Sequence, residues 1–153
     1  MLFYTHVAFS ILIGLFLIDN VFVSNKIVFF IFLVLFSSFP DIDKSNSKIG
    51  KKFGIFSKLI NFFVGHRSFF HSLLFIFLGY ALLSVFSDLI AFAFLIGTAS
   101  HLVLDSMTPA GVAVFYPIQY RFKGRIKTSS LAEKVLFLLF SLLIIIKLST
   151  GHV

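Results

Sequence analysis

The sequence predicts an all-α fold, an integral membrane bundle of about five transmembrane helices that forms a single domain over residues 1–153. The chain is 59% hydrophobic and only 12% charged, and its mean hydropathy is +1.06, whereas a soluble domain carries about 25% charged residues. So few charged groups cannot cover the surface of a soluble domain, and disordered chains are poor in apolar residues. Long apolar segments separated by charged ones then indicate the number of helices.

Two apolar segments occupy the first forty residues. A transmembrane helix needs roughly 20 largely apolar residues, and the uncharged start of the chain predicts a span over Tyr4–Val21. The second segment, Ile27–Phe39, is short. It reaches the length of a span only if it begins near Phe22 and Lys26 extends its amine to the membrane surface. Pro40 disfavours helix at the preceding residue, so this helix should end at Phe39.

Three further spans are predicted in the rest of the chain. They are Ser68–Phe86, Leu89–Met107 and Leu131–Leu148. Two longer loops, Asp41–Arg67 and Thr108–Ser130, lie between spans, and a tight turn at Ser87–Asp88 joins the third span to the fourth. Because successive spans run in opposite directions, both longer loops and the N-terminus are expected on the same side of the membrane.

Basic residues concentrate on that side. Of the 13 lysines and arginines, 11 lie in the two longer loops or at Lys134, and only Lys26 and Lys147 lie on the other side. The positive-inside rule therefore predicts a multi-pass protein of the inner or plasma membrane with these loops and the N-terminus in the cytoplasm. The bilayer thus accounts for the isoelectric point of about 9.9, and no nucleic-acid partner is expected.

Seven ionisable residues from four predicted helices gather at the cytoplasmic ends, and we call them the polar layer. They are His6, Asp41, Asp43, His66, His71, His101 and Asp105. A charged group at bilayer depth costs roughly 2.5–3.5 kcal/mol on insertion scales, so such groups are usually functional. We therefore expect a shared polar site at this membrane face.

The spacing within the polar layer indicates which residues can act together. His101 and Asp105 are four residues apart and share one face of a helix. Asp41 and Asp43 are two apart after a proline, so an extended segment would point both carboxylates the same way.

The histidines that open the third span are five residues apart and cannot share a helix face. We expect His66 in the entry loop, Ser68 as the N-cap and His71 in the first turn of the helix.

Histidine together with carboxylate suits zinc, manganese or iron, whereas magnesium and calcium prefer oxygen ligands alone. Seven candidates exceed the four ligands of a tetrahedral zinc ion, so they fit one to three ions, or one ion with catalytic groups beside it. Each residue alone also has a structural explanation. His6 suits the membrane interface, and His101 suits a hydrogen-bonded core position. Asp41 and Asp43 suit the end of a helix.

Short motifs around these residues resemble one known family. They are Thr5-His6; Pro40-Asp41-Ile42-Asp43; His66-Arg67 with His71-Ser72; and Ser100-His101-Leu102-Val103-Leu104-Asp105, which continues into Ser106-Met107-Thr108-Pro109-Ala110-Gly111 and then Tyr116-Pro117. Their order and their places at helix ends resemble the YdjM-like family of LexA-binding, inner-membrane-associated hydrolases, also described as membrane-bound metal-dependent hydrolases. The family usually has glycine and threonine where this chain has Ser68 and Phe70, so no hydroxyl role is expected at position 70.

The resemblance implies a metal-dependent hydrolase with its site at the cytoplasmic membrane face. The polar layer would hold the metal, zinc before manganese or iron, and Asp43, His71 and Asp105 are the catalytic candidates. Arg67 and Arg121 would bind a phosphate, although Arg67 also suits a membrane anchor. The family is distantly similar to zinc-dependent phospholipases C and P1-type nucleases. That similarity implies a phosphoester substrate, either a small molecule or a lipid-linked one.

Two other functions fit parts of the sequence. A transporter or proton-coupled carrier would use intramembrane histidine and aspartate, but a relay needs polar groups through the membrane thickness, and the opposite halves of the predicted spans are nearly bare. A non-catalytic membrane protein that recruits a cytoplasmic partner, as the LexA-binding description of the family implies, would use the exposed loops.

Overall fold

The structure, a computed structural model, describes residues 1–43, 69–118 and 120–150. These residues form five α-helices: α1 (Phe3–Leu17), α2 (Lys26–Ser38), α5 (Leu73–Ser84), α6 (Asp88–Ser106) and α7 (Leu131–Ser149). Two 3-10 turns, η1 (Phe39–Asp43) and η2 (Phe69–His71), lie after α2 and before α5. Within these ranges there is no β-strand, only an isolated bridge between Val112 and Phe122. The all-α prediction is confirmed.

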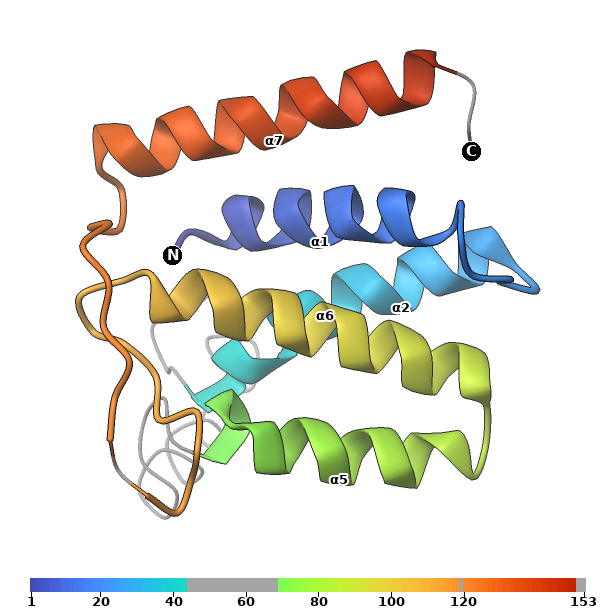
Figure 1. Ribbon diagram of the computed structural model, residues 1–153, viewed down its shortest axis with the longest axis horizontal. Helices are drawn as coiled ribbons and strands as arrows, with labels where there is room; N and C mark the ends of the chain where they lie inside the picture. Colours follow the sequence, from blue (N-terminus) through green and yellow to red (C-terminus); the bar gives the residue numbers. More distant parts are fainter. Residues whose placement is uncertain (44–68, 119, 151–153) are drawn as a thin grey trace.

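The helices run alternately in opposite directions, with α7 above α1 and α6 between α1 and α5 (Figure 1). Helix α6 packs against α1, α2 and α5, while α7 packs against α1. In the core, Phe29 and Leu33 of α2 are fully buried and pack with Leu15 of α1 and Ala93 of α6. This arrangement brings the start of α1, the turns η1 and η2, the end of α6 and the start of α7 to one end of the bundle (Figure 1).

Helix α2 is shorter than the predicted second span because a side chain caps its start. Asn25 is extended, and its side-chain oxygen accepts a hydrogen bond from the Val28 N–H at 3.1 Å. The expected extension of the helix back to Phe22 is therefore absent. Its 13 residues rise about 20 Å, less than the roughly 30 Å of a hydrocarbon core. Its other end is close to the prediction, because η1, which contains Pro40, follows Ser38 directly.

Helix α5 begins later than the predicted third span. The Ser72 hydroxyl accepts a hydrogen bond from the Phe75 N–H at 3.2 Å and is the N-cap. The predicted N-cap, Ser68, lies outside the described residues. His71 consequently lies in η2, before the helix, and not in its first turn as predicted.

Among the described residues, one helix, α6, is long and apolar enough to cross a membrane by itself. Helices α1 and α5 are apolar but shorter, and each ends a few residues before its predicted limit. Helix α7 has 19 residues, but three of them are charged. The described residues therefore contain five helices, and the five membrane spans stay a prediction.

Gly97 allows α2 and α6 to approach closely. A Cβ atom at this position would lie 2.9 Å from both the Leu33 carbonyl oxygen and the Ser37 nitrogen. Both are backbone atoms of α2, so any side chain at residue 97 would push the two helices apart. Small residues at helix contacts are the usual means of close packing in membranes. His101 follows one turn later on the same face of α6, so this contact sets its distance from α2.

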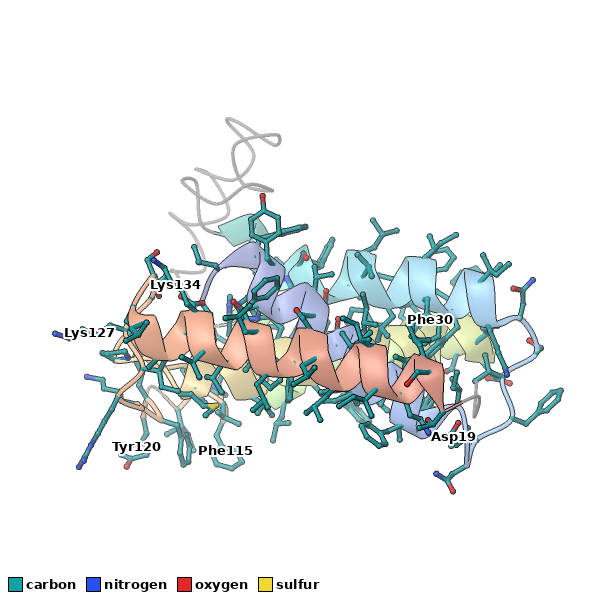
Figure 2. The ribbon with its side chains drawn as sticks, turned by 90° about the horizontal axis from the view of Figure 1, so that it is seen from above. Asp19, Phe30, Phe115, Tyr120, Lys127 and Lys134 are labelled. Atoms are coloured by element: carbon teal, nitrogen blue, oxygen red, sulfur yellow. The ribbon has the colours of Figure 1, made fainter. Side chains whose placement is uncertain are left out.

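Charged side chains lie at the two ends of the bundle. Figure 2 shows Lys127 and Lys134 at the end where α7 begins, and Asp19 at the opposite end. There, Lys147 near the end of α7 forms an ion pair with Asp19, which follows α1. An ion pair therefore joins α1 and α7 at the end of the bundle opposite the start of α1 and the end of α6.

Candidate metal centre

Four ligand-type side chains converge where η1, η2 and α6 meet, and we call them the four-residue group. Asp41 comes from η1, His71 from η2, and both His101 and Asp105 from the last turns of α6. One nitrogen or carboxylate oxygen of each lies within 4.8 Å of those of the others. All four are buried, His101 and Asp105 completely. The segments are far apart in the sequence, so only the fold brings these atoms together.

A hydrogen bond determines which nitrogen of His101 carries the proton. Nδ1 lies 2.7 Å from the Ser37 carbonyl oxygen, and because a carbonyl only accepts, Nδ1 donates. In the neutral ring Nε2 then keeps its lone pair. Nε2 faces two other members of the group, 3.1 Å from His71 Nε2 and 3.7 Å from Asp105 Oδ2. Histidines that bind metals usually donate their second N–H to a carbonyl or carboxylate in this way.

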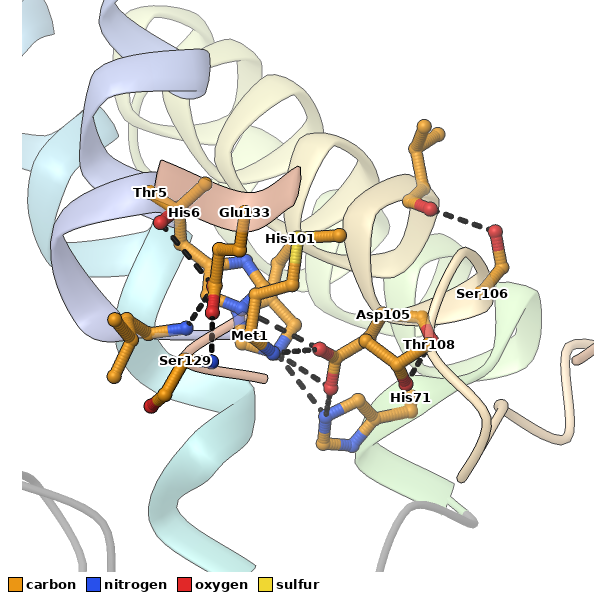
Figure 3. Close-up of polar contacts among 12 residues, drawn as sticks. Met1, Thr5, His6, His71, His101, Asp105, Ser106, Thr108, Ser129 and Glu133 are labelled. Carbon is orange, nitrogen blue, oxygen red and sulfur yellow. Dashed lines mark hydrogen bonds and ion pairs between the residues drawn. The ribbon is translucent and has the colours of Figure 1, made fainter. Parts of the chain in front are cut away.

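The Asp105 carboxylate makes contacts through both of its oxygens (Figure 3). Oδ2 faces the four-residue group, 3.5 Å from His71 Nε2 and 3.7 Å from His101 Nε2. Oδ1 lies 2.7 Å from the amino group of Met1 and 3.4 Å from His6 Nε2. The carboxylate therefore connects the four-residue group to the start of α1.

His6 lies against the four-residue group from the first turns of α1. Its ring stacks on the ring of His101, with centroids 4.0 Å apart and planes inclined by 12°. It is only 1% exposed, and its Nδ1 has no hydrogen-bond partner among the residues that the structure describes. Since buried polar atoms normally have partners, His6 is a further candidate ligand.

The four-residue group fits a metal ion in composition, and three of its members also fit in spacing. Two imidazoles and two carboxylates are donors that suit zinc, manganese and iron. Around a tetrahedral zinc ion with bonds of about 2.0–2.2 Å, ligand atoms lie roughly 3.3–3.6 Å apart. The separations among the His71, His101 and Asp105 atoms, 3.1, 3.5 and 3.7 Å, are close to these values. These residues could therefore share one ion.

Other predicted site residues lie elsewhere or cannot be placed. His66, Arg67 and the side chain of Asp43 fall outside the described part of the chain. The prediction of an extended segment at Asp41 and Asp43 is wrong, because η1 is a 3-10 turn; with three residues per turn, positions two apart do not share a face. Arg121 is exposed in the loop between α6 and α7.

Glu133 is a fully buried carboxylate that is not among the predicted site residues. Its Oε1 accepts hydrogen bonds from the Leu2 N–H at 2.5 Å and from the Thr5 hydroxyl at 3.3 Å. Its Oε2 accepts one from the Ser129 N–H at 2.5 Å. The available sequence signal is Ser130 three residues before Glu133, the spacing of a capping box. That signal predicts the start of α7, but not the bonds to α1.

Comparison with protein families identifies the group to which this chain is related. The family model of the YdjM inner membrane protein matches residues 1–152. The chain belongs to the YdjM family. The resemblance carried by its motifs is thereby confirmed, and membership of a family of inner membrane proteins supports a place in the membrane.

Two curated relatives match part of this YdjM-family chain. Protein YvsG of Bacillus subtilis (strain 168) is 40% identical over 100 residues, which cover 63% of this chain and 62% of YvsG. Inner membrane protein YdjM of Escherichia coli (strain K12) is 37% identical over 95 residues, which cover 55% of this chain and 46% of that protein. The match therefore spans less than two thirds of either relative. No solved structure matches the chain significantly.

Proposed function

We propose that this YdjM-family chain is a membrane-bound, metal-dependent hydrolase that acts on a phosphoester at the cytoplasmic membrane face. The observation that carries the proposal is the pair formed by His101 Nε2 and Asp105 Oδ2, 3.7 Å apart and fully buried. In the neutral ring the bond from Nδ1 to the Ser37 carbonyl leaves the lone pair on Nε2, so two lone-pair atoms face each other. A cation between them, shared with His71 and Asp41, turns this repulsion into binding.

We assign different roles to the chain's residues at this site, metal binding and catalysis. Asp41, His71, His101 and Asp105 would hold the ion, with His6 beside them and Asp43 and His66 as further proposed ligands. Bound zinc, or manganese or iron in its place, lowers the pKa of coordinated water to about 7 and so supplies hydroxide at neutral pH. A carboxylate of Asp43 or Asp105 that is not engaged in binding would accept a proton as general base, and His71 is the other proposed catalytic residue.

The proposed membrane arrangement follows the distribution of charge. Lys127 and Lys134 lie at the end of the bundle that holds the four-residue group (Figure 2). The positive-inside rule then favours the cytoplasm for this end, with the five helices crossing the bilayer. A lipid-linked phosphoester would reach such a site by diffusion within the membrane, and Arg67 and Arg121 would bind its phosphate.

Hydrolysis by the zinc-loaded protein in lipid nanodiscs tests the proposal. The substrates are a panel of soluble and lipid-linked phosphomonoesters and phosphodiesters. We expect turnover of at least one by the wild type, and a loss of at least about 100-fold in His101→Ala and Asp105→Ala. Asp88→Asn removes a carboxylate from the opposite end of α6 and should keep full activity. An inactive wild type, or equal rates in wild type and Asp105→Ala, would contradict the proposal.

A further inference from the structure

Glu133 is the one buried carboxylate of the described residues that the proposed metal centre does not use. It is the third residue of α7, yet two of its three hydrogen bonds come from the start of α1, more than a hundred residues away. Burying a carboxylate is costly unless hydrogen bonds replace the water that it loses. These bonds therefore join α7 firmly to the first turn of α1.

The position of Glu133 suits its charge. The first N–H groups of a helix have no partner within the helix, and the helix dipole favours negative charge at that end. Glu133 lies in the first turn of α7 and accepts one N–H bond from Leu2, the N-cap of α1, and one from Ser129, which directly precedes the N-cap of α7. A neutral side chain would make these contacts less well.

The turn that Glu133 holds is the one that carries His6. Thr5, which donates to Glu133, directly precedes His6, and the His6 N–H donates to the Leu2 carbonyl in the same turn. We propose that Glu133 is a positioning residue that keeps His6 stacked on His101 and facing Asp105 (Figure 3). Its importance for metal binding rests on the proposed function above, whereas its effect on His6 does not.

A purely structural role for Glu133 makes a different prediction, and the chain offers a matched control. Helices α1 and α7 are joined at one end by Glu133 and at the other by the ion pair between Lys147 and Asp19. If Glu133 only joined the helices, loosening either end would have similar effects. If it positions His6, only the change at Glu133 should alter the accessibility of His6.

The first experiment measures the accessibility of His6 without any metal. Purified protein stripped of metal is treated with diethylpyrocarbonate, and modification of His6 is followed by mass spectrometry. His6 is 1% exposed, so slow modification is expected in the wild type. In Glu133→Gln an amide supplies one acceptor oxygen where the carboxylate supplies two, and we expect modification at least about tenfold faster. Asp19→Asn should leave the rate unchanged.

The second experiment measures how metal is held. Cobalt replaces the metal, and its visible absorption spectrum reports the ligand geometry. We expect Glu133→Gln to weaken cobalt binding by about 10–100-fold and to change the spectrum as His6→Ala does. Combining the two substitutions should add no further change, because both act through His6. Asp19→Asn should keep the wild-type spectrum.

The outcomes separate this inference from the metal proposal. If the wild type binds no cobalt, the metal centre is overturned, while the rate of His6 modification still decides the role of Glu133. If cobalt binds and His6 is protected equally in wild type and Glu133→Gln, the positioning role is overturned alone. Should Glu133→Gln not fold, Thr5→Val removes one donor to Glu133 with little change of shape. A smaller but measurable rise in His6 modification then supports the inference, and an unchanged rate overturns it.

Discussion

Replacing Gly97 with valine tests whether the close contact between α2 and α6 sets the geometry of His101. A Cβ atom at residue 97 would lie 2.9 Å from the Leu33 carbonyl oxygen and from the Ser37 nitrogen, where ordinary contact begins at 3.4 Å. Even alanine therefore requires α2 to move by about 0.5 Å, the difference between these distances. Valine requires more, because its methyl groups also meet backbone atoms that cannot turn aside.

The displacement acts directly on the hydrogen bond between His101 and Ser37. Its length is 2.7 Å, and a shift of about 0.5 Å extends it to roughly 3.2 Å, the upper limit of an ordinary N–H···O bond. Valine should break it. His101 then loses the partner that fixes its orientation and tautomer, and loss of such a supporting bond costs about 10–100-fold in metal affinity. We expect zinc binding by Gly97→Val to weaken within that range.

A chelator-competition titration in detergent measures the zinc affinity, with circular dichroism to show that the helices persist. Ala81→Val is the control, because residue 81 is an exposed position of α5, outside the contact between α2 and α6. It introduces the same side chain without moving α2, so we expect wild-type affinity. Unchanged affinity in Gly97→Val, or an equal loss in both variants, would refute the reasoning.

Three further predictions concern topology and stability. The chain contains no cysteine, so Phe22→Cys and Lys127→Cys each create one labelling site. A membrane-impermeant maleimide should label Phe22→Cys in intact cells and Lys127→Cys only after permeabilisation. The reverse pattern would overturn the proposed orientation. Ser130→Ala removes the hydroxyl that caps α7 and should lower the free energy of unfolding by about 1 kcal/mol, measured by thermal unfolding in detergent, whereas no change would show that the cap contributes nothing. Phe29→Ala removes a fully buried side chain and should lower the free energy of unfolding by about 3–5 kcal/mol in the same assay. Phe22→Ala, at a position 93% exposed, is its control. Equal melting temperatures of the two variants would contradict the described core.

The helices could be predicted from the sequence, but their limits could not. Apolar segments bounded by charge predict the helices α1, α2, α5, α6 and α7, because long apolar segments are typical of membrane helices. The start of a helix depends on which neighbouring side chain caps it. Ser68 and Ser72 are both suitable caps by residue type, and the cap of α5 in the structure is Ser72. In the same way Asn25 begins α2 at Lys26, and the expected extension to Phe22 is absent.

The gathering of several polar-layer residues at one end of the bundle could be predicted from topology, whereas their detailed contacts could not. Alternating helix directions bring His6, His71, His101 and Asp105 to one end, and the four-residue spacing of the last two places them on one face. The Ser37 carbonyl and Glu133 depend on how the helices are rotated against each other. Helices that are apolar on all sides carry little periodic signal of that rotation. Gly97 allows the close approach of α2, but a single glycine in the sequence does not indicate which helix packs against it.

Metal stoichiometry of the purified protein tests the central claim most directly. The protein is purified in detergent without added chelator, and zinc, manganese and iron are measured per chain in wild type, in the double variant His101→Ala with Asp105→Ala, and in Asp88→Asn. The account predicts at least one ion per chain in the wild type and in Asp88→Asn, and loss of the ion in the double variant. A wild type without stoichiometric metal, or a double variant that retains it, would contradict the claim that Asp41, His71, His101 and Asp105 form a metal centre.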